Sequence, residues 1–317
     1  MAAVATLGLA LCSHPALAWE RHDLLTRPLL ARQHWLDAYR NILVEPATSD
    51  PSPVNPSYVP VYIDRLPGEH ESAREILDRY VDEPAWGMDA GIHVSPWQKL
   101  DGGSRGYRQS YDYFLAGVVR VGDAPGRMVH FYRLAVADMK SGHTYWAFRN
   151  LARSLFYLEE LGDPLDTQSF QYSWIWQTRF NAARLKTREI NYRLAYDAFV
   201  QQNLESELKA GRGPLLEVLK DPPSMPFMAP RTAARALAEF SHGRAAHLLN
   251  VLDAFLPTRI QSATTVVRPT AAELDPKRAE TSAAVLLQST ADSLQVTGGT
   301  VLSVLEMARK DFARAKK

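Results

Sequence analysis

The chain has 317 residues, and its 36 lysine and arginine residues against 35 aspartate and glutamate residues give a formal net charge of +1. This balance argues against a nucleic-acid-binding protein that works through bulk positive charge. Hydrophobic residues make up 46% of the chain and charged residues 22%, which excludes intrinsic disorder and predicts a sizeable buried core. Cys12 is the single cysteine, so a disulfide scaffold and a cysteine-based zinc finger are excluded.

Residues 1–18 have the pattern of a cleaved secretory signal peptide. They contain no Asp, Glu, Lys or Arg, and they end in the small-x-small sequence Ala16-Leu17-Ala18. The apolar stretch at 4–11 is shorter than the ~20 residues that span a bilayer, so no transmembrane segment is expected. We therefore expect a secreted or periplasmic protein, with cleavage near Ala18 and Trp19 as its new N-terminus.

The first part of the mature chain predicts helices separated by a long loop. Apolar residues recur at helical spacing from Leu24 to Leu43. Six prolines then predict an extended loop over 45–67. A short helix is expected at 72–81, capped by Ser72 and supported by an Arg74–Asp78 pair, and 83–107 is loop-like because of its glycines.

The rest of the chain also predicts helices, and no strand pattern of any length or internal repeat is found. A second loop is expected where prolines cluster at 222–230. The predicted helices cover 108–120, 126–140, 143–161, 172–208 with a break near Thr187, 231–255, and 276–315 with a break at Gly298-Gly299. The predicted fold class is all-α, with a single multi-helix domain over 19–317.

Four short segments distinguish the chain from a generic helical protein. They are Trp86-Gly-Met-Asp89-Ala-Gly91, His130-Phe-Tyr132, the run from Tyr145 through Phe156 and Glu160 to Pro164 and Asp166, and Asn191-Tyr-Arg193-Leu-Ala-Tyr196-Asp197. Together with an N-terminal Trp19, their order and spacing resemble the zinc-dependent phospholipase C and single-strand nuclease superfamily. Members of that superfamily are secreted, all-α and carry a cluster of three zinc ions, and the resemblance is most specific over 145–166.

The resemblance implies a set of metal ligands that this chain retains only in part. The ligand positions that keep the family's residues are the amine and carbonyl of Trp19 and the side chains of His22, Asp89 and His130. Carboxylates of altered length or type stand at three more positions, namely Glu160, Asp166 and Asp197. Phe156 and Arg193 replace two family histidines, and neither side chain has a lone pair for a metal.

These substitutions limit the expected number of zinc ions. The site of Trp19, His22 and Glu160 is formally complete, so one zinc is expected there. The site of Asp89, His130 and Glu160 lacks one ligand of four, so two zinc ions are the upper limit. At the third site Arg193 is expected to pair with Asp166 and Asp197 in place of a metal, and three zinc ions are not expected. The carboxylate-rich set also suits a harder metal such as Mg²⁺ or Mn²⁺.

Each of these residues also has an ordinary structural interpretation. His22 next to Asp23 fits a surface pair, and His130 between apolar neighbours fits a hydrogen-bonded core histidine. Arg193 and Asp197, four residues apart, fit a common helix salt bridge. The joint order and spacing carries the family interpretation, rather than any single residue.

Two functions follow from the resemblance. The first is metal-dependent hydrolysis of phosphate esters, in which Asp89 would orient the attacking water and the substrate would be a phospholipid or a single-stranded nucleic acid. Aromatic residues such as Trp86, Trp174 and Trp176 would then line a lipid or base groove, or else belong to the core. The second is a non-catalytic descendant of the fold that acts as a binding or envelope protein with at most one structural zinc.

Overall fold

The computed structural model describes residues 21–47, 55, 57–91, 103–114, 119–168 and 170–316. The predicted signal peptide at 1–18 and the predicted ligand Trp19 lie outside these residues. The α-helices are α2 (His22–Leu30), α3 (Ala73–Tyr80), α5 (Gly103–Gln109), α6 (Ala124–Ser141), α7 (Thr144–Glu160), α8 (Tyr172–Gln177), α9 (Ala182–Ala210), α10 (Pro214–Lys220), α11 (Pro230–Phe255), α12 (Thr258–Gln261) and α13 (Glu280–Ala315). Short 3₁₀ helices are η1 (His34–Ala38), η2 (Glu83–Trp86), η3 (Pro164–Asp166), η4 (Ala271–Leu274) and η5 (Pro276–Ala279).

The predicted all-α class is confirmed, because the described strands form only two small antiparallel ribbons. β1 (Ile42–Leu43) pairs with β2 (His70–Glu71), with Ile42 opposite Glu71. β3 (Asp112–Phe114) pairs with β4 (Val119–Val121), with Tyr113 opposite Arg120. Within the described ranges, no helix combines the length and apolar character needed to cross a membrane.

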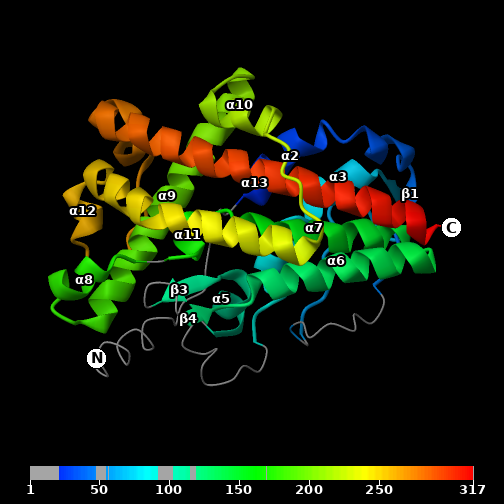
Figure 1. The fold of residues 1–317 in the computed structure, drawn as a ribbon, viewed down its shortest axis with the longest axis horizontal. Coiled ribbons are helices and arrows are strands. Elements are labelled where there is room, and N and C mark those ends of the chain that lie inside the picture. Colours follow the sequence, from blue (N-terminus) through cyan, green and yellow to red (C-terminus); the bar gives the residue numbers. More distant parts are fainter. Residues whose placement is uncertain are drawn as a thin grey trace.

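The long helices α6, α7, α11 and α13 run roughly side by side and form the body of the protein (Figure 1). α13 packs on α11, α10, α6, α7 and α2, and α3 packs on α7. The buried apolar side chains form one continuous core, in which Phe148 of α7 contacts both Trp35 and Phe312 of α13.

α7 lies at the centre of this core. Every residue from Tyr145 to Glu160 is buried, including Arg149, Arg153, Glu159 and Glu160. Burial of an isolated charge is costly, so charged side chains on such a helix require partners of opposite sign. α7 therefore brings the charged residues of the candidate site into the interior.

The N-terminal part of the chain is less helical than its periodicity predicts. The helix that begins at His22 ends at Leu30 instead of running to Leu43. Arg74 of α3 donates hydrogen bonds to the carbonyls of Leu30 and Gln33. A side chain from another helix thus provides a partner for the free carbonyl at the C-terminus of α2. The predicted Arg74–Asp78 pair is consequently replaced, and Asp78 bonds Arg27 at 3.1 Å. The predicted Ser72 cap is confirmed as a capping box with Glu75.

The prediction of a helix over 108–120 is wrong, because this region contains the β3–β4 ribbon. The backbone amides of Tyr111 and Tyr113 donate to the carbonyls of Asp166 and Thr167, each at 3.0 Å. Gly122 closes the ribbon at φ 115°, where a Cβ atom would lie 2.2 Å from the Ser110 carbonyl oxygen. Long-range backbone pairing therefore holds this segment extended.

The helix boundaries in the second half also differ from the prediction. The break after α8 falls at 178–181 instead of Thr187, where Arg179 and Phe180 adopt left-handed φ values of 53° and 59°. α10 (Pro214–Lys220) lies between the predicted helix over 172–208 and the predicted loop over 222–230, where no element was predicted. α13 continues through Gly298-Gly299 without a break. Glycine is required at 299 because a Cβ atom there would lie 2.3 Å from the carbonyl oxygen of Pro223. These glycines allow the 222–225 loop to approach the helix and do not break it.

Candidate functional site

His22 contacts two carboxylates at the end of α7. Its Nδ1 atom lies 3.0 Å from Oε2 of Glu159, and its Nε2 atom lies 3.3 Å from Oε1 of Glu160. Thr26 donates its hydroxyl hydrogen to Glu159 at 2.6 Å, and the ring of Phe156 lies 4.4 Å from the imidazole. The predicted proximity of His22 and Glu160 is therefore present, and the surface interpretation of His22 is wrong because the side chain is buried.

The electrostatics of this pair favour a charged imidazole. Burial lowers the pKa of His22, but hydrogen bonds and Coulomb attraction from Glu159 and Glu160 outweigh burial and raise the pKa to about 10. Burial raises the pKa of Glu159, and the imidazolium opposes that shift. In the contacts of the described residues, His22 is thus an imidazolium held between carboxylates.

Arg193 pairs with a buried carboxylate at the third ligand site, as its residue type predicts. Its guanidinium pairs with the carboxylate of Asp166 and donates a hydrogen bond to the Leu165 carbonyl at 3.0 Å. Asp197 lies one turn further along α9 and is buried. The pairing of Arg193 with Asp166 is therefore confirmed for the first of its two predicted partners.

Asp163 links these two groups and was not found from the sequence. It caps η3 by accepting a hydrogen bond from the Leu165 amide at 2.7 Å. Burial, together with the nearby carboxylate of Glu160, raises the pKa of Asp163 to about 7, although Arg193, the Leu165 amide and His22 oppose the shift. The signal that could have identified Asp163 is its position before Pro164, between two predicted ligands.

Asp89 is also enclosed by partners, one of which is Tyr157 of α7. Its Oδ1 atom lies 3.1 Å from Nη2 of Arg127 and 3.2 Å from Nη1 of Arg108, and Tyr157 donates its hydroxyl hydrogen to Oδ2. Asp89 has no solvent exposure. His130 lies on α6, one turn after Arg127, with its ring edge-on to Phe131.

A third group of buried charges was missed by the sequence analysis. Glu83 of η2 pairs with Arg149 and Arg153 of α7, with Nε–Oε2 distances of 2.8 and 2.9 Å. Tyr58 donates its hydroxyl hydrogen to the same carboxylate at 2.7 Å. Although burial raises the pKa of Glu83, the two arginines lower it to about 2. Two arginines four residues apart on an apolar helix were the available signal.

The side chains that the structure describes do not form the zinc cluster of the superfamily that the sequence resembles. Among the residues that the structure describes, no group of three or more His, Cys, Asp or Glu side chains is arranged to hold a metal ion. His22 and Glu160 lie together, whereas Asp89, His130 and Glu160 do not form a metal-holding group. Guanidinium groups bind the carboxylates of Asp89 and Asp166, and a divalent ion about 4 Å from such a cation would be repelled by several kcal/mol.

The site retains more acids than cations, however. The group that we call the His22 cluster contains four carboxyl groups (Glu159, Glu160, Asp163 and Asp166) and two cations (His22 and Arg193). Protons compensate part of this excess, since burial raises the pKa of both Glu159 and Asp163. Burial therefore favours the protonated forms of these two carboxyl groups.

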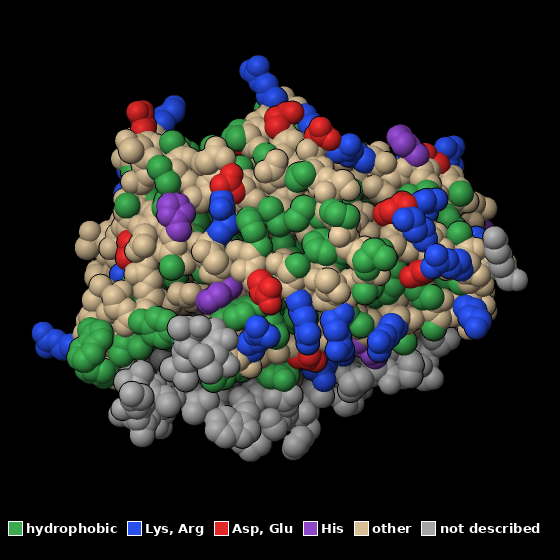
Figure 2. Space-filling view, viewed as in Figure 1, with side chains coloured by type: hydrophobic (Ala, Val, Ile, Leu, Met, Phe, Trp, Pro, Cys, Tyr) green, Lys and Arg blue, Asp and Glu red, His purple; other side chains and the backbone are tan. Residues whose placement is uncertain are grey.

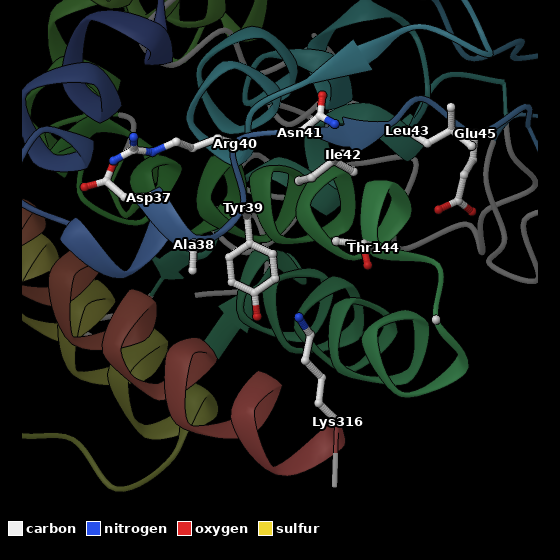
Figure 3. A pocket seen from close by; sticks show the side chains of 11 residues that line it. Asp37, Ala38, Tyr39, Arg40, Asn41, Ile42, Leu43, Glu45, Thr144 and Lys316 are labelled. Carbon is white, nitrogen blue, oxygen red and sulfur yellow. The ribbon is translucent and has the colours of Figure 1, made fainter.

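Surface hollows lie elsewhere. One hollow of about 670 Å³ is lined by residues 37–43, Glu45, Gly142, Thr144 and Lys316 (Figure 3). In this hollow the ammonium of Lys316 lies 4.2 Å from the centre of the Tyr39 ring. None of the predicted site residues lines it.

Comparison with known proteins gives no assignment: no protein-family profile matches the sequence, and no curated protein matches it.

Proposed function

We propose that this chain is a non-catalytic descendant of the zinc phospholipase C and nuclease fold that serves as a binding or envelope protein. The observation that carries the proposal is the environment of Asp89, at the position that would orient the attacking water. Arg127, Arg108 and Tyr157 occupy its two oxygens, and its side chain is fully buried. Protein groups therefore occupy both oxygens of this carboxylate, and it contacts no solvent.

At two other positions a cation of the protein also lies where the resemblance implies a metal, and this supports the proposal. Arg193 pairs with Asp166, and His22 lies between Glu159 and Glu160. Phe156 packs against His22 and contributes no donor atom. Such internal pairs neutralise the buried carboxylates that remain after metals are lost, so the fold is kept without the chemistry.

A metal-dependent phosphoesterase is the second candidate, favoured by the excess of carboxyl groups in the His22 cluster. His22 and Glu160, with the amine and carbonyl of Trp19, would hold one zinc, which would supply Lewis acidity. In this alternative Glu159 would fix the tautomer of His22 by accepting the Nδ1 hydrogen.

Elemental mass spectrometry of the mature secreted protein, combined with assays of phosphodiester and phospholipid hydrolysis, distinguishes the two candidates. For the non-catalytic protein we expect zero or one zinc per chain. We also expect no chelator-sensitive hydrolysis of phosphodiesters or phospholipids. Two or three zinc ions per chain, together with activity that Glu160→Ala abolishes, would contradict the proposal. Hydrolysis that a chelator leaves unchanged would contradict the metal mechanism instead.

A further inference from the structure

The turn between α8 and α9 exposes three aromatic side chains at one end of the molecule. Trp176 is 72% exposed, and Tyr172 and Phe180 are each more than two-fifths exposed. The rings of Trp176 and Phe180 meet edge to face at 4.7 Å. Hydrophobic side chains gather at this corner in Figure 2, over the position of α8 in Figure 1. Apolar side chains of this size are normally buried unless they meet a partner.

Buried neighbours and a backbone hydrogen bond anchor the turn that carries these rings. Trp174 and Ile175 of the same helix are buried, and Trp174 packs on Tyr192 of α9 at 4.5 Å. Phe180 donates its backbone hydrogen to the Ile175 carbonyl at 2.9 Å, although its φ of 59° is unusual for a side chain of this size. The helix and the turn that carry the exposed rings are therefore anchored to the core.

The surrounding segment is basic. Residues 167–188 contain Arg179, Arg184, Lys186 and Arg188, and no aspartate or glutamate. Lys186 pairs with Glu189 at 2.8 Å, and Arg188 pairs with Asp253 at 2.9 Å. Arg179 and Arg184 are exposed, and neither forms an ion pair with a residue that the structure describes. Two cations are thus left available next to the aromatic rings.

A polar hollow adjoins the rings. Its volume is about 390 Å³, and its lining includes Arg184 and Arg188 together with the hydroxyl and amide side chains of Gln177, Thr258, Gln261 and Ser262. No acidic side chain lines the hollow. Arginine in a hollow of hydroxyl and amide groups suits a phosphate group.

We propose that this surface, made of Tyr172, Trp176, Arg179, Phe180 and Arg184, docks the protein on an anionic phospholipid bilayer. Tryptophan and tyrosine favour the boundary between headgroups and acyl chains, because their rings are apolar and their edges are polar. Exposed arginines add attraction to anionic headgroups. Three rings cover too little area for a stable protein interface of about 800 Å² per partner. Two available cations on a chain of net charge +1 give little attraction for a nucleic acid.

Vesicle flotation of the mature secreted protein tests this proposal. Vesicles of phosphatidylcholine with 30 mol% phosphatidylglycerol are compared with vesicles of phosphatidylcholine alone, at low and high salt. We expect binding to the anionic vesicles that weakens with salt, and a blue shift of tryptophan emission. Trp176→Ala/Phe180→Ala should weaken binding at least tenfold, and Arg179→Glu/Arg184→Glu should remove the preference for phosphatidylglycerol.

Two matched variants control for nonspecific effects. Met228→Ala removes an apolar side chain that is 97% exposed elsewhere, and Arg40→Glu reverses an exposed charge elsewhere. Both should bind as the unchanged protein does, and circular dichroism should show the same helix content in all variants.

Three results would overturn the proposal. They are no binding to anionic vesicles, unchanged binding by Trp176→Ala/Phe180→Ala, and an equal loss in the control variants. Displacement from vesicles by a single-stranded oligonucleotide through Trp176 would assign the surface to nucleic acid instead. The proposed loss of catalysis is independent of all these results.

Discussion

The guanidinium of Arg127 lies 3.1 Å from the carboxylate of Asp89, and both side chains are buried next to α7. Arg127 also lies over the rings of Phe131 and Tyr157, at 4.7 and 5.6 Å from their centres. This arrangement places a permanent cation at a position where the family resemblance implies a metal. It also makes the pair testable without a substrate.

Replacing both partners of the Asp89–Arg127 pair should cost less than the sum of the two single replacements. Arg127→Met leaves the buried carboxylate with Arg108 and Tyr157, and we expect a loss of about 3 kcal/mol in the free energy of unfolding. Asp89→Asn/Arg127→Met should lose less than the sum of the two single variants by at least about 1 kcal/mol. Urea denaturation of the four proteins measures both quantities, and strict additivity would argue against a direct pair.

Stability should fall as pH rises through the range set by His22. The pKa of His22 is about 10 in the folded state and 6.5 ordinarily, so folding favours the protonated form. The stabilisation is complete below pH 6.5 and is lost between pH 6.5 and about 10, with each pKa unit worth about 1.4 kcal/mol. Chemical denaturation at pH 6, 8 and 10 measures this loss. His22→Gln should be less stable at pH 6 and show a flatter profile, and an equal slope in the variant would refute the assignment.

Glu83 should give the opposite dependence in acid. Its two arginine partners lower its pKa from 4.5 to about 2, so its stabilisation is present above pH 4.5 and is lost as the pH falls to 2. Glu83→Gln should cost about 3 kcal/mol at pH 7, because it leaves Arg149 and Arg153 buried without an anion. Thermal unfolding at pH 7 and pH 3 should show the difference between the two proteins shrinking in acid.

Gly299 of α13 should not be replaceable, unlike Gly243 of α11. Gly299→Ala places a methyl group 2.3 Å from the Pro223 carbonyl oxygen, and we expect a loss of about 2 kcal/mol. Gly243→Ala meets nothing within 4 Å and should gain roughly 0.5–1 kcal/mol from helix propensity. Melting temperatures of the two variants should therefore move in opposite directions.

Restoring histidines should restore metal binding if the residue correspondence is right. Phe156, Asp166 and Arg193 stand at three positions where the family resemblance implies histidine. The triple variant Phe156→His/Asp166→His/Arg193→His should bind more zinc per folded chain than the unchanged protein, as measured by elemental mass spectrometry. No gain in a variant that circular dichroism shows to be folded would show that these positions do not correspond.

The parts of the fold that local sequence determines could be predicted, and those that depend on distant contacts could not. The Ser72 cap and the end of the helix before Gly162 follow from neighbouring residues. The β3–β4 ribbon depends on carbonyls at 166 and 167, more than 50 residues away. The pair of glycines in α13 looks like a helix break until the loop at Pro223 is known.

The same division applies to the candidate site. The resemblance placed His22 beside Glu160, and the residue type of Arg193 indicated its pairing with a carboxylate. The partners of Asp89 could not be found, because Arg108 and Arg127 lie 19 and 38 residues further along the chain. The role of Glu159 could not be predicted from the sequence, because its contact with His22 depends on how α2 packs against α7.

The contact between α2 and α13 has a consequence for the order of events during biosynthesis. These helices lie about 250 residues apart in the chain, yet they pack against each other. α2 carries His22, so the element that begins the His22 cluster is held in part by a helix that is synthesised about 250 residues later. Contacts between such distant segments form slowly. A nascent chain therefore cannot complete the packing around this cluster until α13 has been synthesised.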